Sequence, residues 1–529
     1  MEFNQKSIPE DGLKGFKNHY TSDALSGFIV FILALPLSLG IAKASEFPPL
    51  MGLITAIIGG MLVSFFAGSR LTIKGPAAGL IVIVMGSVAD FGGAEQGWHY
   101  TLGAIFVAAL IQVLFGLLKW GKLVDVFPLS AVHGMLAAIG IIIILKQIPV
   151  LLDIDPVMSK GKSPFELMAA VPDFLMHLDK KATFIGIVSL IIMLFWNKVK
   201  IPVLRKIPAS LVVLAVAIPA ELLMDFQHTE PTYALVHIGN LIQNVKINID
   251  FNGIHHFGLF SKYVLMFALV GSLESLLTVK AIDMMDPYKR KSNPNRDLIA
   301  IGVGNLIASV LGGLPMISEV ARSSANVTNG AKTRWSNFFH GFFILLFVIV
   351  AVNLIELIPN TALAAMLISV GIKLAHPKEF VHVFRIGKEQ LLIFLITIFF
   401  TLYEDLLIGI GAGMFTKLII HLIHGAPFSA LFKAPVLVSF NQGEYLVEVQ
   451  KAAIFSNYMG LKSKLEAIPQ GMAVTVDFSN TKLVDHSVLE NLHHFADGYI
   501  TDGGRFEVIG IEDHQPLSNH KHSARKKQA

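Results

Sequence analysis

Long apolar runs separated by short polar loops repeat along the chain as far as residue 428. A helix that spans a bilayer needs about 20 mostly apolar residues, and a shorter one must be broken or buried inside a bundle. By this measure the sequence predicts fourteen helical segments. They cover residues 24–41, 50–67, 76–89, 101–118, 129–146, 183–197, 209–224, 261–280, 297–311, 320–329, 338–357, 360–374, 389–402 and 404–423.

Two of these segments, 76–89 and 320–329, are too short to span a membrane alone. Each follows a stretch that contains Gly and Pro, at 68–76 and 312–319. Interrupted segments at matching positions of two halves indicate a transporter binding site. Chance similarity between two Gly-rich helix ends is the alternative.

The residues before the two breaks also resemble each other. Residues 60–68 and 304–312 have the same length and glycine spacing, and their alignment places Lys74 opposite Ser318. Seven segments in each half, an odd number, predict that the halves insert with opposite topology. We therefore expect an α-helical membrane protein built as an inverted repeat of seven plus seven segments.

The composition agrees with a membrane protein, because 53% of the residues are hydrophobic and only 15% are charged. A soluble protein carries about a quarter charged residues. The chain has no cysteine, which excludes disulfides, thiolate metal sites and cysteine nucleophiles. The net charge of +4 is small and argues for basic loops rather than a nucleic-acid partner.

Lysines and arginines in short loops predict the orientation of the chain. They concentrate after even-numbered segments, so these loops and both termini are expected to be cytoplasmic. The loop at 150–182 also contains lysines and does not follow the rule. The basic residues after even-numbered segments are Lys119, Lys122, Lys198, Lys200, Arg205, Lys206, Lys289, Arg290, Lys291, Arg296, Lys332, Arg334, Lys373, Lys378, Arg385 and Lys388.

Ionisable side chains inside apolar segments are costly and mark transport sites by default. Glu274 lies in the middle of the apolar run 263–279. We expect its carboxylate to couple transport to a cation, as a sodium ligand together with backbone carbonyls of the interrupted segment 320–329.

The two interrupted segments predict an anion site. The first turn of a helix presents unpaired N–H groups and about half a positive charge, so two facing helix starts can hold an anion. Ordinary capping of two short helices, with Ser318 as one cap, is the alternative. The amides and hydroxyls expected near the anion belong to Thr72, Ala77, Ala78, Ser318, Val320, Ala321 and Ser323.

Charged residues beside these breaks complicate the site. Lys74 precedes Gly75 and Pro76, and Glu319 precedes the second short segment. We hypothesise a Lys74–Glu319 ion pair that opens and closes with substrate, with Glu319 or Glu274 able to carry a proton. A static buried pair is the alternative. Arg322 follows one turn later, where contact with substrate and pairing with Glu319 or Asn326 both stay open.

The pattern changes after about residue 430. Strands are predicted at 435–440, 444–455, 472–478 and 505–511, with a hairpin turn at 441–443 and a helix at 487–499. This indicates a small α/β domain at 435–513. The polar, His- and Lys-rich tail at 514–529 is expected to be disordered.

Several motifs together carry a family resemblance. Residues 271–278 read GSLESLLT, residues 321–327 read ARSSANV, and residues 476–480 and 484–489 read VDFSN and VDHSVL. With the Gly-Pro-broken third segment, they resemble the SulP anion-permease family over roughly residues 15–512. Members of that family move sulfate, bicarbonate, chloride or dicarboxylates, usually as dimers.

The resemblance implies the uracil-permease type of inverted repeat followed by a cytoplasmic STAS domain. It also implies a transmembrane domain at 23–428 after a cytoplasmic segment at 1–22. The core domain would comprise 23–120 and 260–358, and the gate domain 121–259 and 359–428.

In the sodium-dependent bicarbonate branch of the family, an acid at the place of Glu274 holds the cation, and a residue at the place of Thr278 lies close by. Lys74 and Glu319 depart from that branch and leave the substrate and the coupling ion open. In related anti-sigma-factor antagonists the serine at the place of Ser487 is phosphorylated. A plain helix cap at Asp485 or Ser487 is the alternative.

The expected function is secondary transport of a small inorganic anion, bicarbonate or sulfate, by an elevator movement coupled to Na⁺ or H⁺. A nucleobase–proton symporter, an uncoupled anion channel and a scaffold built around the STAS-like domain are alternatives. No enzyme motif and no cofactor motif is visible. We expect a homodimer in lipid, with many spans, in the plasma or inner membrane.

Overall fold

The computed structural model describes residues 8–528 apart from 202–203, 205–206, 225–234, 240–243 and 245. The chain forms two compact units. One comprises Met1–Gly121 and Ile139–Lys373, and the other comprises Lys122–Ala138 and Leu374–Ala529. The predicted division into core and gate domains follows other boundaries and stays a prediction.

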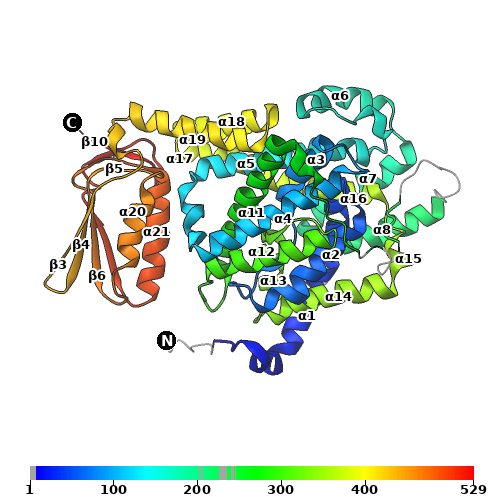
Figure 1. Ribbon diagram of the computed structural model, residues 1–529, viewed down its shortest axis with the longest axis horizontal. Coiled ribbons are helices and arrows are strands. Elements are labelled where there is room, and N and C mark those ends of the chain that lie inside the picture. Colours follow the sequence, from blue (N-terminus) through cyan, green and yellow to red (C-terminus); the bar gives the residue numbers. More distant parts are fainter. Residues whose placement is uncertain are drawn as a thin grey trace. The chain divides into compact units, whose positions relative to one another are not determined.

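Each of the fourteen predicted segments falls on a helix (Figure 1). In the first half these are α1 (Gly12–Ala44), α2 (Pro49–Ile57) with the π turn η1 (Ile58–Leu62), η3 (Ala78–Leu80) with α3 (Ile81–Asp90), α4 (Gly97–Leu117), α5 (Leu129–Leu151), α7 (Lys180–Phe195) and α8 (Ala209–Met224). In the second half they are α11 (Phe257–Met285), α12 (Pro294–Val310), α13 (Val320–Thr328), α14 (Trp335–Val350) with α15 (Val352–Ile355), α16 (Asn360–Leu374), α18 (Lys388–Tyr403) and α19 (Leu406–Ile423). Between predicted segments, the described residues also form the α-helices α6 (Pro164–Met176) and α17 (Pro377–Ile386).

Several helices have the length and composition of membrane spans. Among the described residues, five stretches are long and apolar enough to cross a bilayer. They are Gly12–Ala44, Gly97–Leu117, Leu129–Leu151, Asn252–Met285 and Leu406–Ile423.

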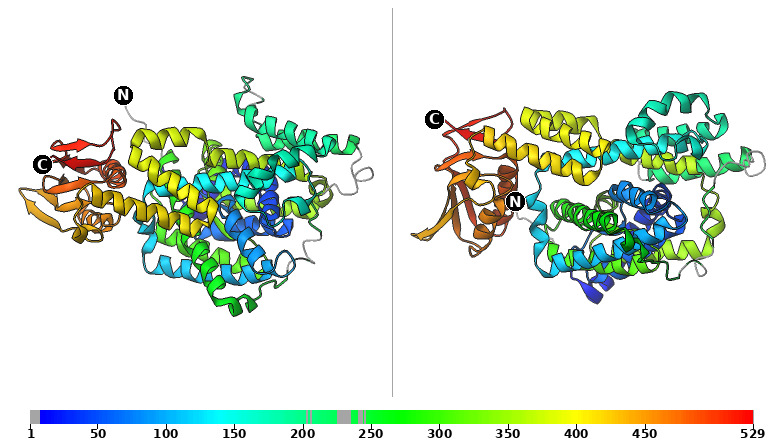
Figure 2. Two further views of the ribbon diagram at one scale, coloured as in Figure 1. Left: turned by 90° about the horizontal axis from the view of Figure 1, so that it is seen from above. Right: turned by 45° about the horizontal axis from the view of Figure 1, so that its top comes forward.

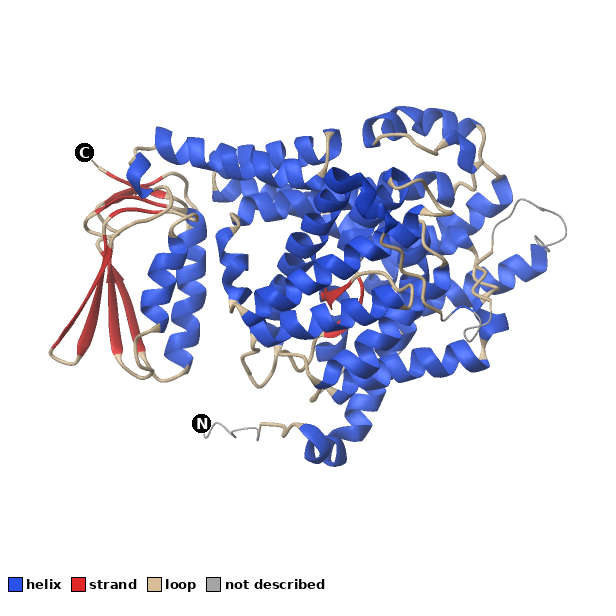
Figure 3. Cartoon of the chain, in the orientation of Figure 1, coloured by secondary structure: helices blue, strands red, loops and turns tan. Residues whose placement is uncertain are grey.

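The two interrupted segments meet inside the first unit. The stretch before η3 forms strand β1 (Ile73–Pro76), and the stretch before α13 forms β2 (Met316–Glu319). The strands pair antiparallel and every residue in them is buried. Figure 3 shows them as short red strands among the helices. Lys74 pairs with Ser318, the residue that the sequence repeat placed opposite it. The prediction that both stretches are broken is confirmed.

The C-terminal domain contains two four-stranded sheets, with the strand orders β3-β4-β6-β8 and β5-β7-β10-β9. The first sheet comprises β3 (Val436–Asn441), β4 (Glu444–Val449), β6 (Ala473–Asp477) and β8 (Arg505–Ile509). Figure 2 gives two further views of this domain, at the orange-to-red end of the colour scale. Its helices are α20 (Tyr458–Glu466) and α21 (His486–Thr501).

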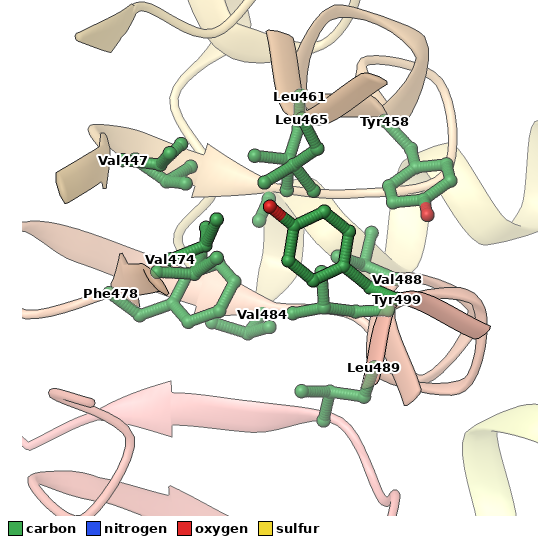
Figure 4. Packing of buried hydrophobic residues seen from close by; sticks show 14 of the residues in the cluster. Val447, Tyr458, Leu461, Leu465, Val474, Phe478, Val484, Val488, Leu489 and Tyr499 are labelled. Carbon is green, nitrogen blue, oxygen red and sulfur yellow. The ribbon is translucent and has the colours of Figure 1, made fainter. Parts of the chain in front are cut away.

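A single apolar cluster holds the first sheet against α20 and α21 (Figure 4). Val447 and Val474 come from the strands, and Leu461 and Val488 come from the two helices. The predicted hairpin is also present, because Gln442 and Gly443 connect β3 and β4 with φ of 50° and 87°. Two central residues at positive φ match the twist of the flanking strands, and glycine adopts positive φ without strain.

The expectation of a disordered tail is wrong. Strands β9 (His514–Pro516) and β10 (Arg525–Lys527) complete the second sheet beside β5 (Lys451–Ala453) and β7 (Thr481–Val484). The tail has few apolar side chains, but β10 forms backbone hydrogen bonds with the edge of β7, and Ser523 and Ala524 are buried. Strand pairing therefore orders a segment whose composition alone predicts disorder.

Candidate functional site

Strands β1 and β2 each lead directly into the start of a helix. Their antiparallel pair, residues 73–76 with 316–319, is called the crossing below. After β1, Ala77 is extended and a helical turn begins at Ala78, and both residues are buried. After β2, α13 begins at Val320, which is 44% exposed, and Ala321 is exposed too. Both starts lie at the end of a strand, so their first N–H groups have no earlier helical turn to bond.

Glu319, rather than Ser318, caps α13. Glu319 is extended, and its Oε2 accepts a hydrogen bond of 2.8 Å from the backbone N–H of Arg322. A carboxylate here also faces the positive end of the helix. Ser318 instead donates its hydroxyl to Asp297 Oδ2 at 3.1 Å. The expected Ser318 cap is therefore wrong.

The hypothesis of a Lys74–Glu319 ion pair is also wrong. Lys74 Nζ lies 3.2 Å from Asp297 Oδ1, and both side chains are 1% exposed. In an antiparallel pair, residues directly opposite each other share one face, and successive residues alternate between faces. Lys74 is opposite Ser318, whereas Glu319 is opposite Ile73. The pleat therefore directs Lys74 and Glu319 to opposite faces of the crossing.

Arg322 contributes a buried guanidinium. Its side chain is among the largest that are fully buried, and Nε, Nη1 and Nη2 find no hydrogen-bond partner in the described part of the chain. Asn326, one partner considered for it, is used elsewhere: its amide bonds Leu71 O and Ser336 Oγ. Glu319 accepts from the Arg322 backbone rather than from the guanidinium. A buried charge without a bonded partner is costly, which points to an anionic ligand.

Gly75 makes room for this guanidinium. A Cβ at Gly75 would lie 2.6 Å from Arg322 Nη1, closer than any real contact. Arg322 therefore lies against the backbone of β1, just before the start of the first half-helix. The same close approach occurs at Gly79, where a side chain would overlap the Glu274 carboxylate.

Glu274 on α11 thus lies against the start of the first half-helix. It is 7% exposed, and Oε1 has no hydrogen-bond partner within the described ranges. Thr278, one turn later on α11, is 6% exposed. Ser275 accepts a 3.3 Å hydrogen bond from the backbone N–H of Ser318, which ties α11 to β2. The buried carboxylate can hold a proton or a small cation beside the two helix starts.

The hydroxyls expected to bind the anion instead form hydrogen bonds that hold the two strands and the start of α13 in place. Ser323 Oγ donates to Glu319 O at 2.5 Å and accepts from the N–H of Ile73 at 2.8 Å, which links α13 to β1. Thr72 Oγ1 accepts from Lys74 Nζ. Together with Ser318, these hydroxyls hold the two strands in place, which leaves backbone amides and Arg322 as the donors for an anion.

One residue that connects the two interrupted stretches, and one buried histidine elsewhere in the first unit, were not identified as candidates from the sequence. Asp297 is the first residue of a predicted segment. An acidic residue is common there because it faces the positive end of the helix, so it gave no sign of another role. His340 on α14 is fully buried, and neither ring nitrogen has a partner among the residues that the structure covers. Its position in an apolar run gave no signal beyond the presence of a histidine.

Ser487 in the C-terminal domain is 1% exposed, and its Oγ accepts a 2.8 Å hydrogen bond from Lys417 Nζ on α19. Asp485 occupies the cap position of α21 but makes no cap hydrogen bond. The alternative of a plain cap is therefore wrong at Asp485, and phosphorylation of Ser487 stays a prediction. Within the described residues, no three His, Asp or Glu side chains form a metal-binding group.

Comparisons with known proteins show which family this chain is similar to. The sequence profile of the sulfate permease family matches residues 20–397. The bicarbonate transporter BicA of Picosynechococcus sp. is 24% identical over 404 residues, which cover 74% of this chain and 68% of BicA. The chloroplastic sulfate transporter 4.1 of Arabidopsis thaliana is 24% identical over 468 residues, covering 85% of this chain and 67% of that protein.

Solved structures share the fold. The transmembrane domain of a cyanobacterium bicarbonate transporter BicA superimposes with a TM-score of 0.64 at 21% identity, covering 75% of this chain and 98% of that one. The murine anion transporter Solute Carrier 26 family member A9, in its inward-facing state, gives a TM-score of 0.66 at 15% identity, covering 96% and 90%. The fold is therefore that of a multi-spanning anion-transporter membrane domain followed by a C-terminal α/β region, and these relatives are transporters rather than enzymes.

Proposed function

Because the chain belongs to the sulfate permease family, which transports small inorganic anions, we propose that it is a secondary active transporter of bicarbonate or sulfate. The observation that carries this proposal is Arg322, a buried guanidinium with no hydrogen-bond partner in the described residues, beside two helix starts. An anion there would receive backbone N–H groups and the arginine charge together.

The acidic residues at the site support coupling to a cation. Glu274 and Glu319 are both buried, and each lies at the start of one half-helix. Adding an anion to one arginine and two carboxylates leaves an excess of negative charge in a medium of low dielectric constant. Entry of Na⁺ or H⁺ with the anion removes that excess. We assign this role to Glu274, because its Oε1 has no partner in the described chain, whereas Glu319 is engaged as a cap.

The hydrogen-bonding chemistry of the substrate links it to the coupling ion. Bicarbonate carries an O–H donor that an ionised Glu274 can accept, which suits coupling to Na⁺. Sulfate has only acceptors, so a neighbouring carboxyl must be protonated to donate to it, which suits coupling to H⁺. The two substrates therefore predict different driving ions at one site.

Transport by an elevator movement of the core domain against the gate domain remains part of the proposal. So do a homodimeric state, an inner-membrane location and cytoplasmic termini. The helix starts on the broken segments would travel together, since β1 and β2 are hydrogen-bonded to each other.

The test is uptake of labelled bicarbonate and sulfate into proteoliposomes with an imposed Na⁺ or H⁺ gradient. We expect uptake of one anion to follow one gradient and to be lost in Arg322→Gln. Arg385→Gln removes the same charge from an exposed position on α17 and serves as the matched control. Absence of uptake of either anion, with normal protein insertion, overturns the proposal.

The same assay separates the alternatives. A nucleobase is neutral and would leave the Arg322 charge uncompensated, so labelled uracil should not accumulate. An uncoupled channel would give linear anion currents that no cation gradient changes.

A further inference from the structure

Asp297 connects the two halves of the inverted repeat at the crossing of their strands. Its Oδ1 accepts from the backbone N–H of Ser69 at 3.1 Å and lies 3.2 Å from Lys74 Nζ. Its Oδ2 accepts from Ser318 Oγ at 3.1 Å. Ser69 and Lys74 belong to the first half and Ser318 to the second, so one carboxylate holds both interrupted stretches.

The Lys74–Asp297 pair is fully buried, and a buried ion pair is weak evidence for stability. Removing two charges from water costs several kcal/mol per ion, and apolar replacements are often as stable. The presence of two opposite charges at this place therefore calls for an electrostatic explanation.

Lys74 is adjacent to the proposed anion site along β1, although its side chain points to the face of the strand pair opposite Gly75 and Arg322, so its charge acts on the anion only through space. It directly precedes Gly75, against which the Arg322 guanidinium lies, and Ala77 at the first helix start follows shortly after. Without Asp297, the charge of Lys74 would add to that of Arg322 and offset part of the negative charge of Glu274 and Glu319, so the anion would be held more strongly in a medium of low dielectric constant. Attraction of that strength slows release, and a transporter must release its substrate in every cycle.

We propose that Asp297 is a positioning residue that sets the anion affinity by neutralising Lys74. Arg322 then remains the cationic side chain at the site that has no hydrogen-bond or ion-pair partner among the described residues. Neither Lys74 nor Asp297 contacts the substrate. The inference rests on the proposed anion transport and adds the origin of its affinity.

If Asp297 sets the affinity by neutralising Lys74, the two single variants should change the anion affinity in opposite directions. Asp297→Asn keeps the size and an acceptor but leaves Lys74 charged, so we expect about tenfold tighter anion binding and a lower maximal uptake rate. Lys74→Met leaves the Asp297 charge uncompensated, so binding should weaken about tenfold. The double variant Lys74→Met/Asp297→Asn removes both charges and should return the affinity to within about threefold of the parent.

Anion affinity is measured on the purified full chain as the rise in melting temperature on titration with bicarbonate and with sulfate. Uptake in proteoliposomes supplies KM and the maximal rate. A purely structural role predicts that both single variants lower the melting temperature and the maximal rate while the affinity stays unchanged, or moves in one direction. Either result overturns the inference.

Two further comparisons keep the test decisive. If Asp297→Asn does not fold, the affinity of Lys74→Met against that of the double variant still decides, because only the charge model predicts recovery in the double. If the parent protein binds neither anion, the proposed function fails. If the parent binds an anion but the single variants do not shift its affinity in opposite directions, only the role of Asp297 fails.

Discussion

Lys417 on α19 and Asp485 at the start of α21 form a buried ion pair, with Lys417 Nζ 2.9 Å from Asp485 Oδ2 and both side chains 0% exposed. The same ammonium donates to Ser487 Oγ, and His421 Nε2 lies 3.4 Å from Asp485 Oδ1. The helix α19, which is long and apolar enough to cross a bilayer, is thus joined to the α/β domain through charged groups rather than through apolar packing alone. Breaking such a pair leaves an uncompensated charge in the interior.

We therefore expect Lys417→Met to destabilise the α/β domain by about 3–5 kcal/mol. Hydrogen–deuterium exchange of residues 436–528 in the full chain measures the change as faster exchange of strand amides. Lys122→Met is the matched control, since the Lys122–Glu466 pair is 35% exposed on each side and should contribute about 1 kcal/mol or less. Equal protection in Lys417→Met and the parent would contradict the expectation.

The α/β domain should also lose stability on acidification. Burial lowers the pKa of His486 from 6.5 to about 4, although its Nδ1 lies 2.7 Å from His522 O. The unfolded chain therefore binds this proton at a higher pH than the folded chain does. Stability from His486 is present above pH 6.5 and is lost as the pH falls toward 4, by up to about 3 kcal/mol.

Protonation of Asp485 also lowers the stability of the domain, but only at a lower pH. Burial alone would raise its pKa, but the Lys417 ammonium and His421 hold the pKa of Asp485 well below its usual range. Its contribution is lost only below pH 3.8, where the unfolded carboxyl takes up a proton first. Melting temperatures between pH 7 and 4.5 should thus report His486 rather than Asp485, and His486→Gln should reduce the dependence of the melting temperature on pH. If the melting temperature of His486→Gln depends on pH as steeply as that of the parent, the pH dependence comes from other groups.

Glu274 and Glu319 should differ when each loses its charge. Glu274→Gln is expected to abolish the dependence of uptake on the cation gradient, because the proposed cation ligand becomes neutral. Glu319→Gln keeps an acceptor at the cap of α13 and should retain the gradient dependence. Uptake is measured for both variants with and without an imposed Na⁺ or H⁺ gradient. Gradient-dependent uptake in Glu274→Gln would rule out Glu274 as the coupling residue.

The two glycines at the site should not tolerate a methyl group. Gly75→Ala brings Cβ against Arg322 Nη1, and Gly79→Ala brings it against the Glu274 carboxylate. Displacing either charge should raise the KM for the anion at least tenfold, about 1.4 kcal/mol of lost binding. Gly258→Ala, where nothing lies within 4 Å of the added Cβ, is the control. A KM for Gly75→Ala equal to that of Gly258→Ala would place Arg322 outside the site.

The alternation of apolar runs and breaks was sufficient to predict the fourteen apolar segments that form helices and the two interrupted stretches, but not the helices α6, α17 and α20. Apolar length and Gly-Pro interruptions act locally, so the sequence reports them directly. The repeat in glycine spacing even placed Lys74 opposite Ser318, as the strands do. The strands of the α/β domain were likewise visible in their alternating pattern, except for β7, β9 and β10.

The partners of the charged residues depended on the tertiary structure. Lys74 turned to Asp297, 223 positions away along the printed sequence, because the pleat of β1 points it away from Glu319. The tail became ordered because β7 offered it an edge, and Ser487 became buried because Lys417 approached it from another segment. The sequence by itself therefore determined where the chain is helical, strand-like or broken, since those properties come from neighbouring residues. Which charges meet, and so what each one can do, was decided only when distant segments packed against one another.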